Sequence, residues 1–448
     1  MKKGQEIELK IEGVDFPNKG YGFIEEERVV IKHTIPGQVV KGVINKKRKN
    51  KLEARHLGVI EKAPNEVEYK CKYFTMCGGC NYQNLEYKEQ LELKMSQVKK
   101  LVDTAGINYG SFDQIESSPI ENEYRNKMEF SFGDAFKDGP LELGMHKRGS
   151  FHDIVNIVGC NIVSNEFSII LDETLNYCKE NELEYYKKRT HEGYLRHLVV
   201  RKSFRDNNYL VSIVTSSQTN HDFTKLANIL KDKINVAGFI HIINDGLADV
   251  VKADEMNVIY GQDHIMERLF DLDFKISQFS FFQTNTKGAE KLYSVVREFA
   301  GEHADRTIFD LYCGTGTIAQ VLSHNAKKVY GIELVAEAVE AAKENAKLNN
   351  INNCEFIAGD VYEKVHELSE EPDLIILDPP RDGIHPKAIG KIIDFNAKEM
   401  VYVSCKPSSL ARDLKIFEEA GYTVEKIKCV DMFPQTVHVE TVAKLIKK

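Results

Sequence analysis

Stretches that alternate apolar and polar side chains fill the first sixty residues of the chain. Successive side chains of a strand point to opposite faces of a sheet, so this alternation predicts strands with one buried face. A strand about every ten residues, separated by turns, is typical of a small β-barrel. The predicted strands are 6–11, 21–25, 28–32, 38–45 and 51–60, with Gly20, Gly22 and Pro36-Gly37 in the turns.

The pattern changes after residue 60. A cysteine-rich loop leads into a charged helical stretch at 87–101, and the chain to about 270 then mixes strand and helix patterns: strands at 127–132 and 195–201, helices at 164–181 and 223–233. From about residue 280 strands and helices alternate regularly, as in a doubly wound parallel sheet. Since 448 residues exceed one ordinary domain, we predict three: a β-barrel at 1–60, an α+β domain at 61–270 and an α/β domain at 271–448.

Composition narrows the class of protein. A hydrophobic content of 42% supports real cores, and no apolar run approaches the length that crosses a membrane. The first residues lead directly into a charged strand pattern, unlike a signal peptide. The nine cysteines are an odd, scattered set rather than the framework of a small secreted protein. We therefore expect a reduced, cytoplasmic protein without a membrane partner.

Charge is distributed unevenly. The net charge is -8, yet residues 1–60 carry 13 Lys and Arg against 8 Asp and Glu, with the densest cluster at 46–51. Such a basic region neutralises phosphates, although the tip of a solvated hairpin is the alternative for this cluster. A second basic group lies further along the chain, at Arg125, Lys127, Lys147, Arg148, Lys187, Lys188, Arg189, Arg196 and Arg201. We expect RNA contacts from 125–127 and 196–197.

Three cysteines lie within ten residues at Cys71, Cys77 and Cys80, with two glycines between the last pair. Glycines let a backbone wrap closely around a ligand, so this spacing indicates a metal site. Cys160, which follows a glycine, is the best candidate for a fourth ligand. Four thiolates suit zinc as well as an iron–sulfur cluster, and the spacing alone does not decide between them.

The α/β region has the features of a nucleotide-type cofactor site. A strand at 307–311 runs into Gly314-Thr-Gly316, and the next strand ends in the carboxylate of Glu333, which is placed to hold ribose hydroxyls. The third glycine of the dinucleotide fingerprint is missing, because residue 319 is Ala. With Asp360 after the third strand, the region resembles the S-adenosylmethionine pocket of class I methyltransferases. In Asp378-Pro-Pro-Arg381 the residue after the prolines is not the aromatic that would suggest methylation of an amino group.

Cys405 ends the apolar strand 401–404, where a parallel sheet keeps its reactive groups. A buried cysteine is otherwise inert packing. Here Lys406 follows, and a helix begins near Ser408, so a thiolate would lie near a cation and a helix N-terminus. We therefore predict that Cys405 is a nucleophile.

A thiolate makes a particular methylation feasible. Its attack on C6 of uracil turns C5 into an enolate carbon that accepts a methyl group, after which a base must remove the C5 proton. Glu440 is the candidate base if the last strand runs antiparallel, because its first residues then lie near Cys405. An exposed carboxylate at a strand edge is the alternative. The uridine has to be flipped out or looped, and with no Trp in the chain its stacking falls to Phe281 or Phe282.

The motifs together resemble those of the RNA (uracil-C5)-methyltransferases, a family that includes the 23S rRNA enzymes of the RumA and RlmCD type and the related tRNA enzyme TrmA. The resemblance extends over nearly the whole chain. It departs from the family pattern at Lys406, Gln435 and Val437. The matching motifs are a TRAM-like, OB-like N-terminus, C-x5-C-G-G-C with Cys160, Phe281-Phe-Gln-Thr-Asn285, 310–316, Asp378-Pro-Pro-Arg381, Ser404-Cys405-x-Pro407, and Asp431-Met-Phe-Pro with His438-Val-Glu440.

The resemblance implies a function and its residues. It implies methylation of 23S rRNA uridine by a monomer, with Cys405 as nucleophile and Glu440 as base. It also implies a 4Fe-4S cluster on Cys71, Cys77, Cys80 and Cys160, and S-adenosylmethionine contacts from Gln283, Tyr312, Glu333 and Asp378. Two alternatives stay open: the same chemistry on the T-loop uridine of tRNA, and a non-catalytic iron–sulfur protein that binds RNA.

Overall fold

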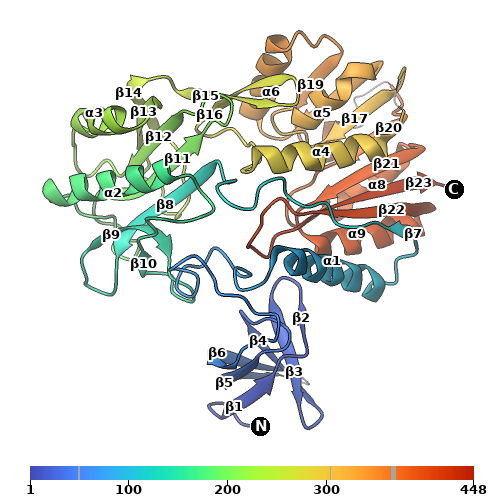
Figure 1. The fold of residues 1–448 in the computed structure, drawn as a ribbon. Helices are drawn as coiled ribbons and strands as arrows, with labels where there is room; N and C mark the ends of the chain where they lie inside the picture. The colour runs from blue at the N-terminus through green and yellow to red at the C-terminus, as the bar shows by residue number, and fades with distance from the viewer. Residues whose placement is uncertain (49–50, 303, 365–369) are drawn as a thin grey trace. The chain divides into compact units, whose positions relative to one another are not determined.

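The computed structural model describes the chain from residue 1 to 448 apart from 49–50, 303 and 365–369. The chain forms two compact units, each assembled from separate stretches (Figure 1). Unit 1 comprises residues 1–70, 80–118 and 379–448, and unit 2 comprises 71–79 and 119–378.

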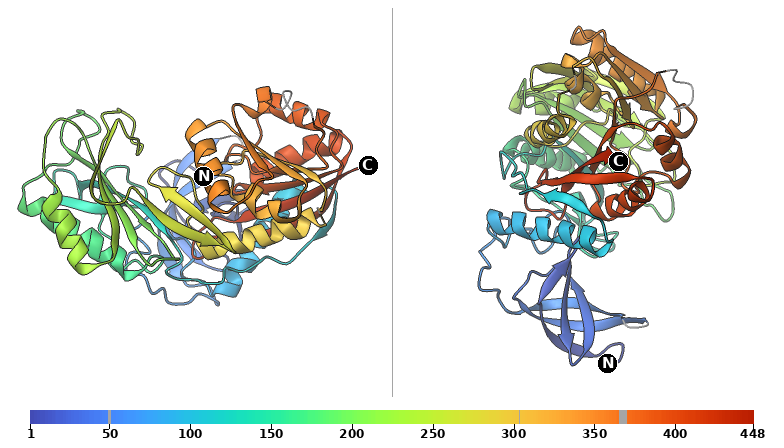
Figure 2. Two further views of the ribbon diagram at one scale, coloured as in Figure 1. Left: turned by 90° about the horizontal axis from the view of Figure 1, so that it is seen from above. Right: turned by 90° about the vertical axis from the view of Figure 1, so that its right-hand side faces the viewer.

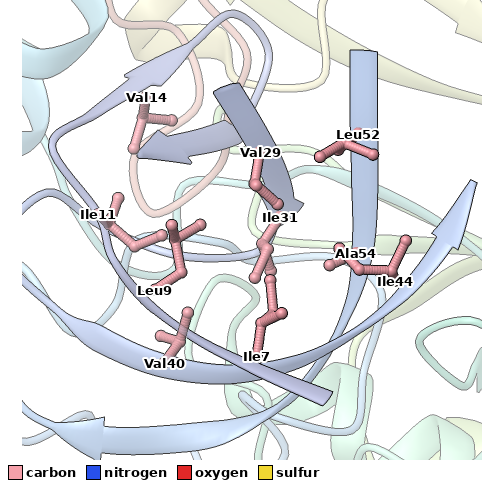
Figure 3. Close-up of a cluster of buried hydrophobic side chains, with 10 residues drawn as sticks. All are labelled: Ile7, Leu9, Ile11, Val14, Val29, Ile31, Val40, Ile44, Leu52 and Ala54. Atoms are coloured by element: carbon pink, nitrogen blue, oxygen red, sulfur yellow. The ribbon is translucent and has the colours of Figure 1, made fainter. Parts of the chain in front are cut away.

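The N-terminal part of unit 1 is a six-stranded sheet in the order β1-β5-β6-β4-β3-β2. Alternate residues of its strands are buried, as the sequence pattern predicts, and the strands curl around one apolar core (Figure 2, right). The core contains ten aliphatic side chains, among them Leu9, Val29 and Ile31, which point toward one another (Figure 3). The strands are β1 (Glu6–Lys10), β2 (Gly13–Asp15), β3 (Lys19–Ile24), β4 (Glu27–Lys32), β5 (Val39–Arg48) and β6 (Lys51–Glu61).

The remainder of unit 1 contains four strands that stand in the order β21-β23-β22-β7 within an eight-stranded sheet. β23 runs antiparallel to both β21 and β22, while β7 joins β22 in parallel. Helix α9 packs on β21 and β22, and α1 packs on α9. The elements are α1 (Tyr87–Thr104), β7 (Tyr109–Phe112), α8 (Pro386–Asp394), β21 (Glu399–Ser404), α9 (Pro407–Glu419), β22 (Tyr422–Val430) and β23 (Glu440–Lys447).

Unit 2 contains a seven-stranded sheet in the order β10-β9-β8-β11-β12-β13-β14. The central strands β11 and β12 are buried on both faces, whereas β14 is mostly exposed. Helices α2 and α3 pack against each other and against strands of this sheet (Figure 1). The elements are β8 (Lys127–Asp134), β9 (Leu141–His146), β10 (Ile154–Val155), α2 (Asn165–Glu180), β11 (Leu195–Lys202), β12 (Tyr209–Thr215), α3 (Thr224–Lys233), β13 (Val236–Ile243) and β14 (Glu255–Gly261).

The second half of unit 2 is an α/β layer with parallel strands in the order β19-β18-β17-β20. The hairpin of β15 and β16 precedes it, and β17 and β20 are buried along their whole length. The elements are β15 (His264–Leu269), β16 (Leu272–Ser277), α4 (Thr286–Ala300), β17 (Thr307–Leu311), α5 (Thr317–Leu322), the 3-10 turn η1 (Ser323–Asn325), β18 (Lys328–Glu333), α6 (Ala336–Leu348), β19 (Cys354–Ala358), α7 (Val361–Lys364) and β20 (Leu374–Leu377).

The elements that the sequence predicts are present with ends shifted by a few residues, and the parallel α/β pattern is confirmed. Short strands such as β2 and β10 were missed, because two or three residues carry no alternation. The predicted boundaries at residues 60 and 270 stay a prediction. None of the helices in the described part of the chain combines the length and apolar character that crossing a membrane requires.

Candidate active site

The glycine turn after β17 is built on left-handed backbone. Tyr312, Gly314 and Gly316 have φ angles of 70°, 55° and 72°. A Cβ on Gly316 would lie 2.6 Å from Cε1 of Phe356. This turn therefore needs glycine at 316 for both conformation and space.

Glu333 ends β18 beside this turn. Its Oε2 accepts a hydrogen bond from the Gly314 amide at 3.0 Å, and its Oε1 accepts one from the Val335 amide at 2.9 Å. Two backbone donors fix the orientation of the carboxylate and leave lone pairs on both oxygens for a hydroxyl donor. The prediction from the sequence, a carboxylate at this strand end, is confirmed in position.

Three carboxyl groups gather at the ends of neighbouring strands of this layer. Asp310 is completely buried in β17, and its pKa is raised well above the usual value by burial and then by the charges of Asp378 and Glu333. Its Oδ2 accepts from the Ala319 amide at 2.9 Å, while Oδ1 has no hydrogen-bond partner in the part of the chain that the structure describes. Burial raises the pKa of Asp378 to about 7. This group of acids suits a ligand that carries positive charge.

The segment before α4 carries Gln283 and is held from the seven-stranded sheet. The Asn126 side chain donates to the Gln283 carbonyl at 3.1 Å and to Oγ1 of Thr286 at 2.9 Å. The same segment is tied to the glycine turn, because Oγ1 of Thr315 donates to the Phe281 carbonyl at 3.1 Å. The structure therefore brings Gln283, Tyr312, Glu333 and Asp378 into one half of unit 2.

Cys405 and Glu440 lie in unit 1, where Cys405 directly follows β21 and Glu440 is the first residue of β23. Ser404 pairs with Thr441 in the antiparallel ladder of β21 and β23. Cys405 and Glu440 are the next residues beyond this pair, so both lie at the same end of the β21–β23 ladder. Cys405 is partly exposed and Glu440 is 5% exposed. The predicted antiparallel direction of the last strand, on which this pairing depends, is confirmed.

The helix that follows Cys405 begins immediately. Lys406 is the N-cap residue of α9 and Pro407 its first residue, so the thiol lies at the positive end of a 13-residue helix. The Lys406 ammonium lies 3.5 Å from Oδ1 of Asp382, so it is paired with this carboxylate. The helix terminus is therefore the stronger reason for a thiolate here.

The thiols elsewhere in the folded layers are in a different environment. Burial raises the pKa of Cys178, Cys354 and Cys429 to about 12. Burial also raises the pKa of Cys313 well above its usual range. A nucleophile has to be the thiolate, so burial disfavours these four thiols as nucleophiles.

Three of the four predicted cluster ligands are neighbours in unit 2. Burial, with a smaller effect from Cys71 and Cys77, raises the pKa of Cys160 to about 11. The Gly79 amide donates to the Cys77 sulfur at 3.4 Å. Cys80 belongs to unit 1. Within the described residues no three His, Cys, Asp or Glu side chains are arranged as a metal site.

Several predicted RNA contacts are wrong. Arg196 is 5% exposed and donates to the carbonyls of Asn244, Gly246 and Ala248. Arg201 is 3% exposed and donates to the Gln278 and Ser280 carbonyls, while Asn126 is 4% exposed. These side chains hold loops of their own unit and are not available to phosphates.

The basic cluster at 46–51 is only partly described. Lys49 and Asn50 lie outside the described residues. Lys46 and Lys47 are exposed and pair with Glu53 at 3.3 Å and Glu27 at 3.9 Å.

The model of the tRNA (uracil-5-)-methyltransferase family matches residues 86–448. The chain belongs to this family. An RNA methyltransferase of Clostridium tetani is 50% identical, over 100% of this chain and 99% of its own, and one of Clostridium acetobutylicum is 51% identical over the same shares. The crystal structure of the Pyrococcus abyssi tRNA (uracil-54, C5)-methyltransferase with S-adenosyl-L-homocysteine has a TM-score of 0.78 and 26% identity, and covers 98% of this chain and 99% of that one.

Membership of the uracil-C5 methyltransferase family makes the chain an S-adenosylmethionine-dependent RNA methyltransferase. The alternative of a non-catalytic RNA-binding protein is set aside. The multidomain prediction, an N-terminal sheet domain followed by a methyltransferase fold, is confirmed at this level.

Sequence reasoning missed two sets of residues in this family member. Asp310 was part of a motif but was not chosen as a site residue, although an acid inside an apolar strand is a signal. The second set is on α1, where Gln90, Lys94 and Gln97 occupy the buried face. Their helical spacing was visible, but Gln90 and Lys94 bond to Gln435 and Asp431, 345 and 337 residues away.

Proposed function

We propose that the enzyme methylates C5 of uridine in 23S rRNA through a covalent bond between Cys405 and C6 of the base. The observation that carries this proposal is the β21–β23 register, in which Ser404 pairs with Thr441, so that Cys405 directly follows one paired residue and Glu440 directly precedes the other. A thiol and a carboxylate at this spacing are the two groups that the chemistry needs.

Cys405 begins the reaction. Its thiolate, favoured by the N-terminus of α9, attacks C6, and the electrons of the C5–C6 double bond move to C5 and O4 as an enolate. S-adenosylmethionine supplies the methyl group that C5 takes and leaves as S-adenosylhomocysteine. Cys405 remains bonded to C6 at this stage.

Glu440 completes the reaction in this proposal. Its carboxylate removes the proton from C5, the double bond between C5 and C6 forms again, and the thiolate of Cys405 leaves. The product is 5-methyluridine, and the sulfur returns to its starting state. An acid with 5% exposure has little contact with water, so its proton is transferred onward when the site opens to product release.

The cofactor residues fit their group. We propose that the Glu333 carboxylate holds the ribose hydroxyls and that Asp378, Gln283 and Tyr312 contact the rest of the cofactor. The buried Oδ1 of Asp310 without a partner among the described residues, with two further acids beside it, supports a ligand that carries a sulfonium and an ammonium group.

We further propose a 4Fe-4S cluster on Cys71, Cys77, Cys80 and Cys160. The mutual electrostatic effects of Cys71, Cys77 and Cys160, and the amide donor to the Cys77 sulfur, support a site for thiolate ligands. Such thiols stay reduced in the cytoplasm, which is where we expect the enzyme to act. Its role in this proposal is to hold the loop.

Transfer RNA is a second candidate for the substrate, beside 23S rRNA. The N-terminal sheet is proposed to be a TRAM-like RNA-binding module, and the motif resemblance to the 23S rRNA enzymes favours rRNA. Yet the Pyrococcus tRNA enzyme aligns with 98% of this chain, so the N-terminal sheet does not separate the two substrates. The T-loop uridine of tRNA is therefore the second candidate. In both RNAs the target base has to be flipped, and Phe281, 65% exposed, is available to stack on it, whereas Phe282 is buried.

One experiment tests substrate and chemistry together. Sites of 5-methyluridine are mapped in rRNA and tRNA from cells with and without the gene, and purified enzyme is given each RNA with labelled S-adenosylmethionine. Loss of an rRNA site, and transfer to rRNA by a monomer, are expected. Loss confined to the T-loop makes tRNA the substrate, and full transfer by a Cys405→Ala variant refutes the mechanism.

A further inference from the structure

Helix α1 buries polar side chains where a helix normally buries apolar ones. Lys94 is 0% exposed and Gln90 is 1% exposed. Burying an ammonium group away from water is strongly unfavourable unless its protons are donated to acceptors. A buried lysine therefore indicates that its ammonium is hydrogen-bonded to another segment of the chain.

The segment that these side chains hold is the connection 431–439 between β22 and β23. The Lys94 ammonium donates to Oδ1 of Asp431 at 2.7 Å and to the Phe433 carbonyl at 3.0 Å. Gln90 donates to Oε1 of Gln435 at 2.9 Å and accepts from the Gln435 amide at 2.9 Å. Asp431 is also 0% exposed, so the ion pair is completely enclosed.

A third support comes from the chain just after Cys80. The amides of Asn81 and Tyr82 both donate to the Gln435 carbonyl, at 2.8 and 3.0 Å. Gln435 itself has a φ of 70°, a conformation that a glutamine adopts only when its surroundings require it. The amide, the carbonyl and the Oε1 of Gln435 therefore all have partners, two of them from Gln90 of α1 and one from the amides of 81–82.

The connection ends at Glu440. Val430 pairs with Glu440 in the ladder of β22 and β23, so Asp431 begins the connection one residue beyond the partner of Glu440. In the described part of the chain 431–439 belong to no named strand, and the Asp431 amide donates to the Glu116 carbonyl at 2.9 Å. The side-chain contacts from α1, together with the amides of 81–82, hold the connection at Asp431, Phe433 and Gln435.

We propose that Lys94 and Gln90 are positioning residues that hold the Glu440 carboxylate for removal of the C5 proton. This inference rests on the proposed function, in which Glu440 acts only after the methyl group has been transferred. Neither side chain contacts the base; each acts through the connection 431–439. Displacing Glu440 therefore slows the last step and leaves attack by Cys405 and methyl transfer intact.

The prediction is that a methylated RNA–protein adduct accumulates in the Lys94→Met variant. With labelled S-adenosylmethionine and substrate RNA, the label appears in a protein band that survives denaturing gels, and its release slows by about 10- to 100-fold, the lower part of what a general base contributes. Gln90→Leu, which leaves the ion pair intact, gives the same effect if Lys94→Met fails to fold. Lys88→Met, on the exposed first turn of the same helix, releases product at the wild-type rate.

A second RNA separates positioning from a general structural effect. With 5-fluorouridine at the target site no C5 proton can be removed, so the adduct is stable without a base. Lys94→Met and Gln90→Leu should trap this RNA at the wild-type rate. A loss of trapping equal to the loss of turnover, or turnover lost with no accumulated adduct, overturns the positioning role. If the wild-type enzyme traps no 5-fluorouridine RNA through Cys405, the proposed function itself fails.

Discussion

Gly316 offers a measurement of how tightly the cofactor turn is built. A Gly316→Ala substitution keeps the chain chemically almost unchanged but adds one carbon. That carbon lies 2.6 Å from Cε1 and 2.7 Å from Cζ of Phe356, and 3.0 Å from Cβ of Ala342. The backbone at 316 has φ 72° and ψ 24°, which is the left-handed helical conformation.

Two effects determine the size of the change. Placing an L-residue with a Cβ in the left-handed region costs about 1–2 kcal/mol. Inserting a methyl group into a packed core costs about 1–3 kcal/mol, because Phe356 and the helix that bears Ala342 have to move. The unfolding free energy should therefore fall by about 2–5 kcal/mol. Gly149→Ala is the matched control in the same unit, because its φ is 77° and nothing lies within 4 Å of the added carbon. The unfolding free energy of this control should fall only by the cost of the left-handed backbone, about 1–2 kcal/mol.

The assay is urea unfolding of both variants, with calorimetric titration of S-adenosylhomocysteine. Part of the strain in Gly316→Ala can be relieved by a shift of the turn whose Gly314 amide holds Glu333. If this shift costs the bound state about 1.4 kcal/mol, S-adenosylhomocysteine should bind about tenfold more weakly. Gly149→Ala should bind as the wild type does. If the two variants are equally stable, the close approach to Phe356 is not what requires glycine, and the reasoning fails.

Three further predictions concern the thiols and a buried acid. Cys405→Ala should abolish methyl transfer, while its binding of S-adenosylhomocysteine stays unchanged. Cys354→Ala is the control and should remain active. Methyl transfer by the Cys405→Ala variant would show that Cys405 is not the nucleophile. Protein purified without oxygen should contain about four irons per chain and absorb visible light. Cys160→Ser should lose the iron and Cys178→Ala should keep it, whereas zinc in the wild type would refute the cluster. Burial raises the pKa of Asp378 to about 7. Between the unfolded pKa of about 4 and this value, the carboxyl group is protonated in the folded state and ionised in the unfolded state. The contribution of Asp378 to the unfolding free energy therefore falls as the pH rises from about 4 to 7. Asp378→Asn should flatten this decline in the unfolding free energy, and an unchanged slope would contradict the raised pKa.

The positions of Cys405 and Glu440, which we propose as the catalytic pair, were predictable because they follow from local patterns. An apolar run that stops at Cys405, and a final strand that starts at Glu440, are both readable along the chain. Once the last strand is taken as antiparallel, both residues are expected at the same end of the ladder, and the pairing of Ser404 with Thr441 confirms that placement. The ends, order and direction of strands can be predicted from the pattern of apolar and polar residues along the chain.

The direction of charged side chains was not predictable in the same way. Arg196 and Arg201 looked like phosphate contacts because they are cations in a basic stretch, yet they sit on β11, whose residues are almost all buried. Lys94 was one charge among many on a charged helix. Whether a cation faces water or a carbonyl depends on segments far away in the sequence, and the chain composition around it does not contain that information.

These buried donors share one physical task. Arg201 donates to the Gln278 and Ser280 carbonyls, Asn126 to the Gln283 carbonyl, and Lys94 to the Phe433 carbonyl. Each accepting segment lies outside the strand ladders, so its backbone groups lack the partners that a sheet provides and would be costly to bury unpaired. A side chain long enough to reach from a helix or strand supplies the missing donor and at the same time sets the path of the segment. The segments so held carry Phe281 and Gln283 in one case and lead to Glu440 in the other. The enzyme thus orders its irregular, site-bearing segments from regular elements behind them, and a substitution of the donor should disturb the chemistry of residues that it never touches.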